Sequence, residues 1–319
     1  SLSMNDVGLA LHGADVGAGP HAEARPWPLA RVLFVQGANP VATAMNQGEF
    51  ISGLERDDLF TVVHDQVLTD TALYADVVLP ATTHFEAADL MASYGSFSLQ
   101  RINPVIARVG ESRSNDEVAS AIAAALGLTG SEFDPDPERM AAIVLTSGMN
   151  GSSASVRPVG TTVQFVDTYP SFTGSTGSTA SGRARLHDPA SELPLPFYVA
   201  PGREGLTLLT PSSNRTINSM FAEFDPPEAA VSVHPVDAAA RGIEDGDVVR
   251  AFNDLGEIRL LARVDGRVRP GVVSIPKGFW RRQFDNGHTA NVLIPRGVND
   301  LASGACFNDA RIEIERCIR

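Results

Sequence analysis

Apolar runs that stop abruptly at polar residues divide the first half of the chain into short strands and helices. The run at 60–63 (FTVV) ends in the polar turn HDQ, and a second run at 77–79 (VVL) is stopped by a proline. Between these runs, Thr69 and Asp70 can cap a short helix over residues 70–75. Polar side chains at the carboxyl end of a buried parallel strand lie where open α/β sheets bind nucleotides. The segment therefore predicts both a local fold and a class of ligand.

The same alternation of apolar runs and helical patterns extends over residues 1–148. A buried strand is predicted at 31–36 (RVLFVQ), and the loop GANP follows it. The clearest helix is predicted at 114–126, which opens with a capping box (S-x-x-E) and has its apolar residues on one face. A further helix is predicted at 137–145. Strands that alternate with helices indicate an α/β fold with a mostly parallel sheet covered on both faces.

The pattern changes to period two over residues 204–319, where charged and apolar residues alternate along short segments. The tripeptide DLG at 254–256 predicts a hairpin turn, and a short helix is predicted at 235–241. Six strands with few helices indicate a closed or nearly closed β-barrel. The candidate strands are 206–210, 230–233, 247–253, 257–264, 271–276 and 310–314.

Composition separates these two zones and limits the classes of function. Residues 149–203 are rich in Gly, Ser and Thr without sustained periodicity, so they predict a linker or a long surface excursion. The apolar runs are too short to span a membrane. The net charge of −13 over 319 residues argues against nucleic acid as a general partner, although backbone amides and a few arginines can still hold one dinucleotide.

The chain has two cysteines, Cys306 and Cys317, and no CxxC pair. This argues against a structural zinc site or an iron–sulfur cluster built by this chain. A disulfide between them and two reduced thiols both remain open, and reduced thiols agree with the cytoplasmic location that we favour.

Two loops after predicted strands carry candidate binding residues. In GANP, Gly37 permits close approach of a ligand to the backbone, and Asn39 offers an amide; the alternative is an ordinary strand-to-helix turn with Asn as the cap. In HDQ, Asp65 can accept hydrogen bonds from a guanine edge or a ribose diol. The alternative there is a capping carboxylate beside a solvated histidine, His64.

A group of acids at Glu86 and Asp89, near His84, invites an acid–base or metal interpretation. Nothing in the sequence fixes their geometry, and acids at the start of a helix usually complement its dipole. We therefore expect a structural role for this group.

The loop TPSSNR at 210–215 is polar, carries one arginine and suits a pyrophosphate. The later stretch 279–291 adds aromatic residues, two arginines and amides, which fit a planar heterocycle with phosphates. The alternative is a solvated loop with a buried tryptophan. We find no P-loop, G-x-S-x-G elbow, H-E-x-x-H or G-x-G-x-x-G after a strand, so no residue is predicted to be catalytic.

Taken together, these motifs resemble the C-terminal portion of molybdopterin oxidoreductases of the dimethyl sulfoxide reductase family. The most specific match is TDTALYADVVLP followed by Glu86. The resemblance covers nearly all of the chain in order. The other matching segments are VQGANP, SYGSFSLQ, GESRSNDEVASAIAAALG, SGRARL, LTLLTPSSNRTINSMF, HPVDAAARGIEDGDVV, GVVSIPKGFW and ANVLIP.

The resemblance implies a Rossmann-like layer at 1–148 and a six-stranded double-psi barrel at 204–319. It also implies a bis(molybdopterin guanine dinucleotide) cofactor that holds molybdenum or tungsten. Carried over by position, one group of residues would lie near a guanosine: Gly37, Asn39, Asp65 and Thr69. A second group would approach phosphate or pterin: Thr210, Asn214, Arg215 and Asn218. Asn291 and Asn308 would hydrogen-bond a pterin edge.

The chain departs from the family in length. Family members usually carry iron–sulfur cysteines and the metal-ligating residue in an upstream part, and neither is found here. We therefore expect a fragment that is inactive alone, with its cofactor site empty. Its partners would be the missing N-terminal domains, a small redox substrate and an electron-transfer partner.

Two rival interpretations stay open. One is a non-catalytic scaffold of an electron-transfer complex that retains the fold without metal, and the other is a self-contained nucleotide-binding α/β protein. A natural N-terminus with an export signal would make the protein periplasmic rather than cytoplasmic.

Overall fold

The computed structural model describes residues 2–17, 23–92, 98–133, 136, 162–164, 204–224, 226, 228–299 and 304–317. The chain forms two compact units. One comprises residues 1–63, 68–77 and 196–319, and the other comprises 64–67 and 78–195. The helix predicted at 137–145 lies outside the described residues. So does the predicted linker, apart from a short strand at 162–164.

A three-stranded sheet, with the order β1-β2-β3, is built from the first apolar runs. Its strands are β1 (Val32–Gln36), β2 (Phe60–Asp65) and β3 (Val77–Pro80). It is a parallel sheet, as the alternation of strands and helices predicts. Between β1 and β2 the chain forms α2 (Pro40–Thr43) and α3 (Gln47–Leu54).

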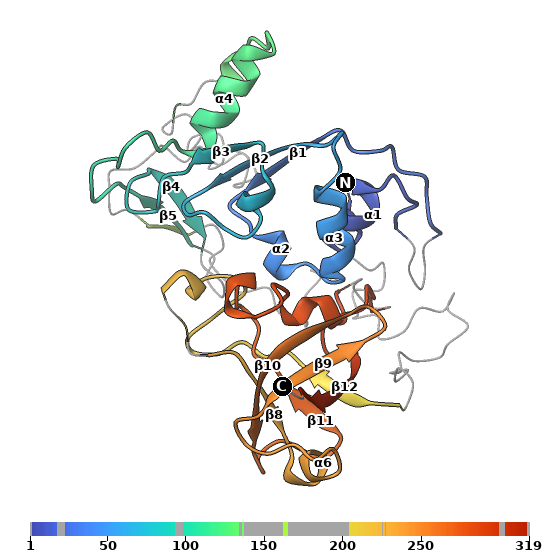
Figure 1. Ribbon diagram of the computed structural model, residues 1–319. Coiled ribbons are helices and arrows are strands. Elements are labelled where there is room, and N and C mark those ends of the chain that lie inside the picture. The colour runs from blue at the N-terminus through green and yellow to red at the C-terminus, as the bar shows by residue number, and fades with distance from the viewer. Residues whose placement is uncertain are drawn as a thin grey trace, which may run out of the picture. The chain divides into compact units, whose positions relative to one another are not determined.

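One face of this sheet is covered by helices, and Figure 1 shows α1, α2 and α3 on the same side of β1 and β2. The N-terminal helices are η1 (Met4–Asp6) and α1 (Val7–Leu11). Leu11 and Phe50 pack with Leu33 of β1 in one apolar cluster, and Val35 packs with Val63 in another. The opposite face carries exposed apolar side chains, so the prediction that both faces are covered is wrong for the described part of the chain.

In the other compact unit the strands are antiparallel. The order is β4-β5-β6, with β4 at Asp89–Ala92, β5 at Ser98–Ile102 and β6 at Thr162–Gln164. Strand β6 lies inside the predicted linker, which is therefore not irregular throughout. Among the described residues, α4 (Asn115–Ala125) and η3 (Ser131–Phe133) follow β5 in this unit.

Helix α4 matches its sequence prediction closely. It begins after Ser114, whose backbone N and Oγ donate to one carboxylate oxygen of Glu117 at 2.8 and 3.0 Å. It ends before Gly127, which has φ of +72°. Both ends thus follow from local chemistry, since a capping box favours the start and a left-handed glycine favours the stop.

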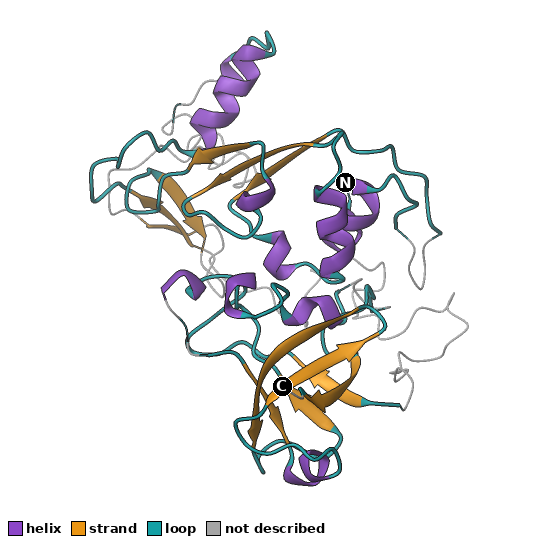
Figure 2. Ribbon diagram, viewed as in Figure 1, coloured by secondary structure: helices purple, strands orange, loops and turns teal. Residues whose placement is uncertain are grey.

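A closed six-stranded barrel forms from the last third of the chain, as predicted (Figure 2). The strand order around it is β10-β8-β11-β7-β12-β9. Strands β10 and β8 pair in parallel, as do β11 and β7, whereas the other described pairs are antiparallel. The strands are β7 (Leu206–Leu209), β8 (Ala230–Val233), β9 (Val248–Asn253), β10 (Gly256–Val264), β11 (Val272–Ser274) and β12 (Arg311–Arg316).

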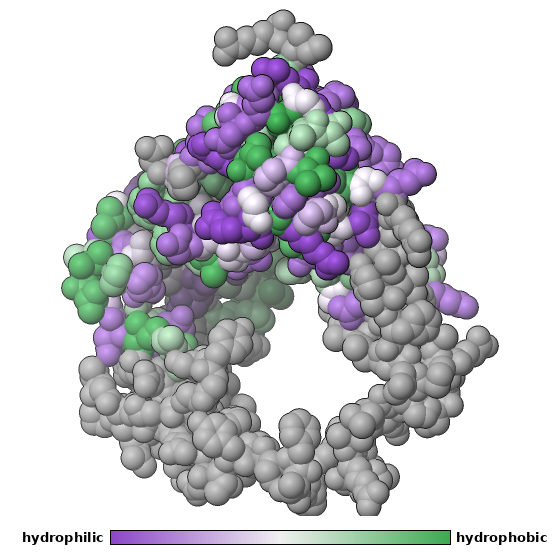
Figure 3. Space-filling view, turned by 90° about the horizontal axis from the view of Figure 1, so that it is seen from below, coloured by the Kyte–Doolittle hydropathy of each residue, from purple (hydrophilic) through white to green (hydrophobic). Residues whose placement is uncertain are grey.

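The barrel interior is filled by small and branched apolar side chains. Alternate residues of each strand point inward, as in Ile312 and Ile314 of β12, which are each 2% exposed. The predicted hairpin joins β9 to β10 through Asp254 and Leu255. Seen from the α6 end, hydrophilic residues on the outside are interspersed with small hydrophobic patches (Figure 3).

Short helices connect these strands. Helix α6 ends two residues earlier than predicted, at Ala239, and the chain reaches a left-handed glycine, Gly242, with φ of +62°. In the described part of the chain after β7 the short helices are η4 (Ala222–Phe224), α6 (Pro235–Ala239), η5 (Arg281–Gln283) and η6 (Ala290–Leu293). Another short helix, η2 (Ala72–Tyr74), lies between β2 and β3.

Candidate functional site

The GANP loop after β1 is fixed by a buried asparagine. Asn39 is 4% exposed, and its Oδ1 accepts hydrogen bonds from the backbone N and the Oγ1 of Thr71, at 3.1 and 2.9 Å. Its Nδ2 is buried without a partner in the described part of the chain. Gly37 is exposed with φ of +55°, and no atom would contact a Cβ there within 4 Å. The loop therefore combines an open backbone position with an unsatisfied buried donor.

The turn at 69–71 is the second element of this site. Thr69 Oγ1 accepts a hydrogen bond from the backbone N of Ala72, the first residue of η2, at 3.2 Å, although the N-cap position of this helix is Thr71 and not the predicted Thr69 or Asp70. That helix is one 3-10 turn rather than the predicted 70–75, because Ala75 already has extended backbone. The Asn39–Thr71 bonds join this turn to the GANP loop, which brings Asn39 and Thr69 into one region.

Asp70 is a buried carboxylate that the sequence prediction treats only as a cap. It is 3% exposed, and its Oδ2 accepts a hydrogen bond from the backbone N of Arg281 at 2.8 Å. Burial raises the pKa of Asp70, against the hydrogen bond from Arg281 and the charges of Arg281 and Arg282. The Arg281 guanidinium also hydrogen-bonds the Tyr74 hydroxyl and lies 5.5 Å from the centre of its ring.

Buried amides join the same region to loops of the barrel. Gln47, at the start of α3, is fully buried and exchanges two hydrogen bonds with Thr289, both of 3.0 Å. Its Nε2 also donates to Val41 O at 2.5 Å. Asn291 Nδ2 donates to Ala42 O at 2.9 Å, so the amide donor expected at a pterin edge is used inside the protein. Its Oδ1 has no hydrogen bond within the described residues.

Thr210 and Asn308 form a pair at the end of β7. Thr210 N donates to Asn308 Oδ1 at 3.1 Å. Thr210 is 4% exposed, and its Oγ1 is buried without a hydrogen-bond partner in the described chain. The two predicted residues thus lie together, and one of them presents an unsatisfied hydroxyl.

The loop after Thr210 presents three further predicted residues to solvent: Asn214, Arg215 and Asn218. A turn closed by Ser213 and Thr216 holds the loop, and Thr216 Oγ1 donates to Lys277 O at 2.8 Å. Asn218 has φ of +54°. The Arg215 guanidinium forms no ion pair or hydrogen bond within the described residues, which leaves its charge accessible.

Asp65 belongs to the other compact unit. It ends β2 and is half-buried, and its Oδ1 accepts a hydrogen bond from Gln66 N at 2.7 Å. Its carbonyl accepts one from Ala81 N at 3.0 Å. The first of these bonds is local to the turn, and the second joins the end of β2 to the residue that follows β3. His64 beside it is fully buried, with Nε2 3.1 Å from Arg113 O, so the alternative of a solvated histidine is wrong.

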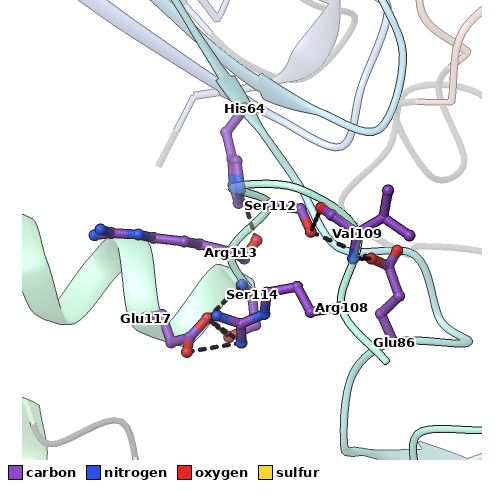
Figure 4. A network of polar contacts seen from close by, with 8 residues as sticks. All are labelled: His64, Glu86, Arg108, Val109, Ser112, Arg113, Ser114 and Glu117. Carbon is purple, nitrogen blue, oxygen red and sulfur yellow. Dashed lines mark hydrogen bonds and ion pairs between the residues drawn. The ribbon is translucent and has the colours of Figure 1, made fainter. Parts of the chain in front are cut away.

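Figure 4 shows polar contacts of this unit, with Glu86 beside Val109 and Ser112. Glu86 is 8% exposed and accepts four hydrogen bonds: two from Thr83, one from Val109 N and one from Ser112 Oγ. The bonds from Thr83 and Val109 lower the pKa of Glu86 to about 2. Glu86 lies in a turn and not at a helix start, so the helix-dipole interpretation is wrong. Its role is structural, as expected. The carboxylate holds the turn at Thr83 against the loop that contains Val109 and Ser112.

Other polar features of the described residues lie apart from the predicted site. A cavity of about 660 Å³ in the second unit is lined by Arg108, Arg113, Glu117 and residues of α4 and the following loop. Among the residues that the structure describes, no cluster of His, Cys, Asp or Glu has the composition to hold a metal ion. Cys306 and Cys317 are not joined by a disulfide. No described helix has the length and apolar character needed to cross a membrane.

Three residues of this region make long-range contacts that the sequence did not predict: Gln47, Asp70 and Thr289. The one usable signal was Gln47, a polar residue on the same face of α3 as the buried Phe50 and Ile51. The partners of Asp70 and Gln47 lie more than 200 residues away along the chain, and no local pattern reports such pairs.

Two family models match the chain. One, described as "Molybdopterin oxidoreductase", matches residues 18–125, and the other, described as "Molydopterin dinucleotide binding domain", matches residues 206–311. Each model covers one of the two folds described above: the N-terminal strands and helices, and the barrel.

Curated relatives match over nearly the whole chain. The probable oxidoreductase YoaE of Bacillus subtilis (strain 168) is 33% identical over 332 residues, which cover 99% of this chain and 47% of the relative. The dimethyl sulfoxide/trimethylamine N-oxide reductase of Cereibacter sphaeroides is 25% identical over 346 residues, which cover 91% of this chain and 42% of the relative. The chain thus spans less than half the length of these relatives.

Among solved structures, acetylene hydratase from Pelobacter acetylenicus has the same fold. The TM-score is 0.70 at 20% sequence identity, and the match covers 92% of this chain and 45% of the hydratase. The ordered motifs, the two family models and the relatives agree. The chain therefore belongs to the molybdopterin oxidoreductases of the dimethyl sulfoxide reductase family.

Proposed function

We propose that this chain is the C-terminal cofactor-binding portion of an oxidoreductase that uses bis(molybdopterin guanine dinucleotide). In this proposal Gly37, Asn39, Asp65 and Thr69 bind a guanosine. The residues toward phosphate or pterin are Thr210, Asn214, Arg215 and Asn218, and those toward a pterin edge are Asn291 and Asn308. The bound metal, molybdenum or tungsten, would supply oxygen-atom or electron transfer.

The observation that carries the proposal is a pair of buried polar atoms without partners. Asn39 Nδ2 and Thr210 Oγ1 are both buried and unsatisfied within the described chain. Leaving such a group unpaired costs about 1–3 kcal/mol, so native proteins usually satisfy it with a ligand or water. A cofactor rich in carbonyl, amide and phosphate groups offers partners to both, and the accessible Arg215 suits its phosphates.

The roles of these residues differ. Gly37 lets a ligand approach the backbone, because it has no side chain in an open position. Asn39 would donate from Nδ2 while Oδ1 stays bonded to Thr71. Arg215 would neutralise phosphate charge, and Asn291 would accept through Oδ1. None of these residues is assigned a chemical step, so we expect no turnover from this chain alone.

Guanosine binding tests the proposal without activity. We expect GDP to raise the melting temperature of the chain measurably and ADP not to do so. The variant Asn39→Asp keeps the acceptor for Thr71 but removes the free donor, and it should weaken GDP binding at least tenfold. Thr43→Ser, at a position whose hydroxyl bonds only Asn39 O, is the matched control and should bind normally. Equal responses to GDP and ADP would instead favour a general nucleotide-binding protein.

Metal analysis of the full-length protein separates the enzyme from a scaffold. Stoichiometric molybdenum or tungsten supports the oxidoreductase. A fully folded protein that contains neither metal supports a scaffold of an electron-transfer complex.

A further inference from the structure

A cavity beside α4 shares no residue with the site that we propose for the cofactor. Its volume of about 660 Å³ lies within the usual range for small-molecule sites, about 300–1,000 Å³. One wall is a single face of α4 that includes Glu117, Ala121 and Ala124, because residues three and four positions apart on a helix lie on the same side. The other walls come from the loops before and after this helix. We call it the α4 cavity.

Arg113 is held by its backbone and presents its guanidinium to this cavity. Its backbone N donates to Pro80 O at 3.0 Å, and its carbonyl accepts a hydrogen bond from Thr82 N at 3.1 Å. The Nε2 of the fully buried His64 lies 3.1 Å from the same carbonyl. Within the described residues the guanidinium has no hydrogen bond or ion pair, and in Figure 4 its side chain extends away from the carbonyl that meets His64. The chain thus fixes the position of Arg113 without using its charge.

The second arginine of the cavity, Arg108, is paired. Its Nη2 donates to both carboxylate oxygens of Glu117, at 2.8 Å each. Glu117 also accepts from the backbone N and the Oγ of Ser114, so its carboxylate is fixed from two sides. The charged lining of the cavity therefore consists of two arginines and one glutamate, which leaves a net charge of +1. A positive cavity in a chain with a net charge of −13 favours a ligand with a single negative charge.

Apolar side chains form most of the remaining lining. Ala121 and Ala124 are exposed on the helix, Leu128 is 48% exposed and Phe133 is partly exposed. Small-molecule sites combine such apolar walls with a few convergent polar groups. A guanidinium can bind a carboxylate through two parallel N–H···O bonds, while the apolar walls cover the body of the ligand. Inorganic phosphate fits less well, because it carries more charge and has no apolar body to cover these walls.

We propose that the α4 cavity binds a small organic monocarboxylate whose body is aromatic or branched aliphatic. Arg113 binds the carboxylate, and Ala124, Leu128 and Phe133 contact the body. The Arg108–Glu117 ion pair fixes the neighbouring wall. None of the residues that we assign to guanosine, phosphate or pterin lines this cavity, so the inference does not depend on the proposed function.

Isothermal titration calorimetry with 2-naphthoate tests the assignment, with 2-naphthamide as a neutral ligand of nearly the same shape. We expect one site per chain for 2-naphthoate and about tenfold weaker binding of the amide, because the charge-assisted bond to the guanidinium is lost. Arg113→Gln keeps the backbone hydrogen bonds and should weaken 2-naphthoate binding about tenfold, with little effect on the amide. Arg259→Gln is the matched control: the Arg259 side chain is 53% exposed on β10 and lies 3.9 Å from Glu257, and this variant should bind normally.

A second pair of variants locates the ligand on α4. Ala124→Trp fills the cavity from an exposed helix position and should abolish 2-naphthoate binding. Ala119→Trp is its control, because Ala119 is also exposed but lies on the opposite face of α4, outside the cavity lining. Both positions are exposed, so both variants should fold.

Four results would overturn the proposal. One is the absence of saturable heat with 2-naphthoate. Equal affinity for 2-naphthamide would remove the carboxylate from the ligand. Unchanged binding in both Arg113→Gln and Ala124→Trp would place the ligand elsewhere on the chain. Displacement of 2-naphthoate by an equal concentration of inorganic phosphate would assign the cavity to phosphate.

Discussion

Gln47 offers the sharpest test of how the N-terminal helices are held to the barrel loops. Its side chain is fully buried and makes three hydrogen bonds, to Val41 O, Thr289 Oγ1 and Thr289 N. In Gln47→Ala, the Val41 carbonyl and the Thr289 amide lose these partners. Each buried unpaired group costs about 1–3 kcal/mol, so the loss should be about 2–6 kcal/mol.

A charge-changing variant separates hydrogen bonding from packing. Gln47→Glu keeps the size of the side chain, but an ionised carboxylate cannot donate to Val41 O. Burial should raise the folded-state pKa of the new carboxyl above its unfolded value of about 4.3. A group with a raised pKa loses stabilisation as pH rises through that range. The deficit of Gln47→Glu relative to the unchanged protein should therefore be small near pH 4 and large at pH 7.

Urea unfolding followed by tryptophan fluorescence measures these differences. Trp280 is 3% exposed and packs with Ala42 in the same compact unit, so its emission reports on this region. Gln66→Ala is the control, because Gln66 is exposed and makes one side-chain bond of 3.3 Å; its effect should stay within about 0.5 kcal/mol. A loss below about 1 kcal/mol in Gln47→Ala, or a pH-independent deficit in Gln47→Glu, would refute the reasoning.

Three further predictions concern buried carboxylates and a glycine. Because burial raises the pKa of Asp70, the ionised carboxylate costs stability as pH rises from 3.8. Asp70→Asn keeps an acceptor for the Arg281 amide, so urea unfolding should show it at least as stable as the unchanged protein at pH 7, with the gain vanishing near pH 4. Glu86 has the opposite sign: its pKa of about 2 means that its stabilisation is present above pH 4.5 and is lost as pH falls, and Glu86→Gln should flatten that part of the stability profile. Gly205→Ala should lower the free energy of unfolding by about 2 kcal/mol or more, because φ is +79° and a Cβ would lie 2.8 Å from the Ile312 carbonyl oxygen. Gly242→Ala is the control: φ is also positive but no described atom lies within 4 Å of the added Cβ, so it should cost about 1 kcal/mol in the same urea unfolding measurement.

Local chemistry explains which elements the sequence predicts well. Helix α4 is bounded by Ser114 and Gly127, whose caps depend only on neighbours in sequence. Strand β12 is visible as Ile312 and Ile314 between charged residues, because one face of the strand is buried and the other is not. The hairpin at 254–255 follows from turn residues alone.

Features that depend on distant partners could not be predicted in this way. The order of the barrel strands departs from their order along the chain, so no short pattern contains it. Glu86 reads as one acid among several until Val109 and Ser112 are brought to it. Asn291 reads as a ligand-binding amide, yet its donor reaches Ala42, 249 residues earlier. The candidate site is similar: the sequence indicates polar loops, but not which of their atoms remain unsatisfied.

The place of β12 in the barrel has a consequence for how the protein is made. Strand β12 lies between β7 and β9, and it pairs with both. Until residues 311–316 have left the ribosome, β7 and β9 therefore both have an unpaired edge, and the barrel cannot close. Strands with unpaired edges tend to aggregate, so the emerging chain passes through a period in which chaperones and translation speed govern the yield. Synonymous codons that slow translation shortly before residue 311 should consequently lower the soluble fraction, while the folded product stays unchanged.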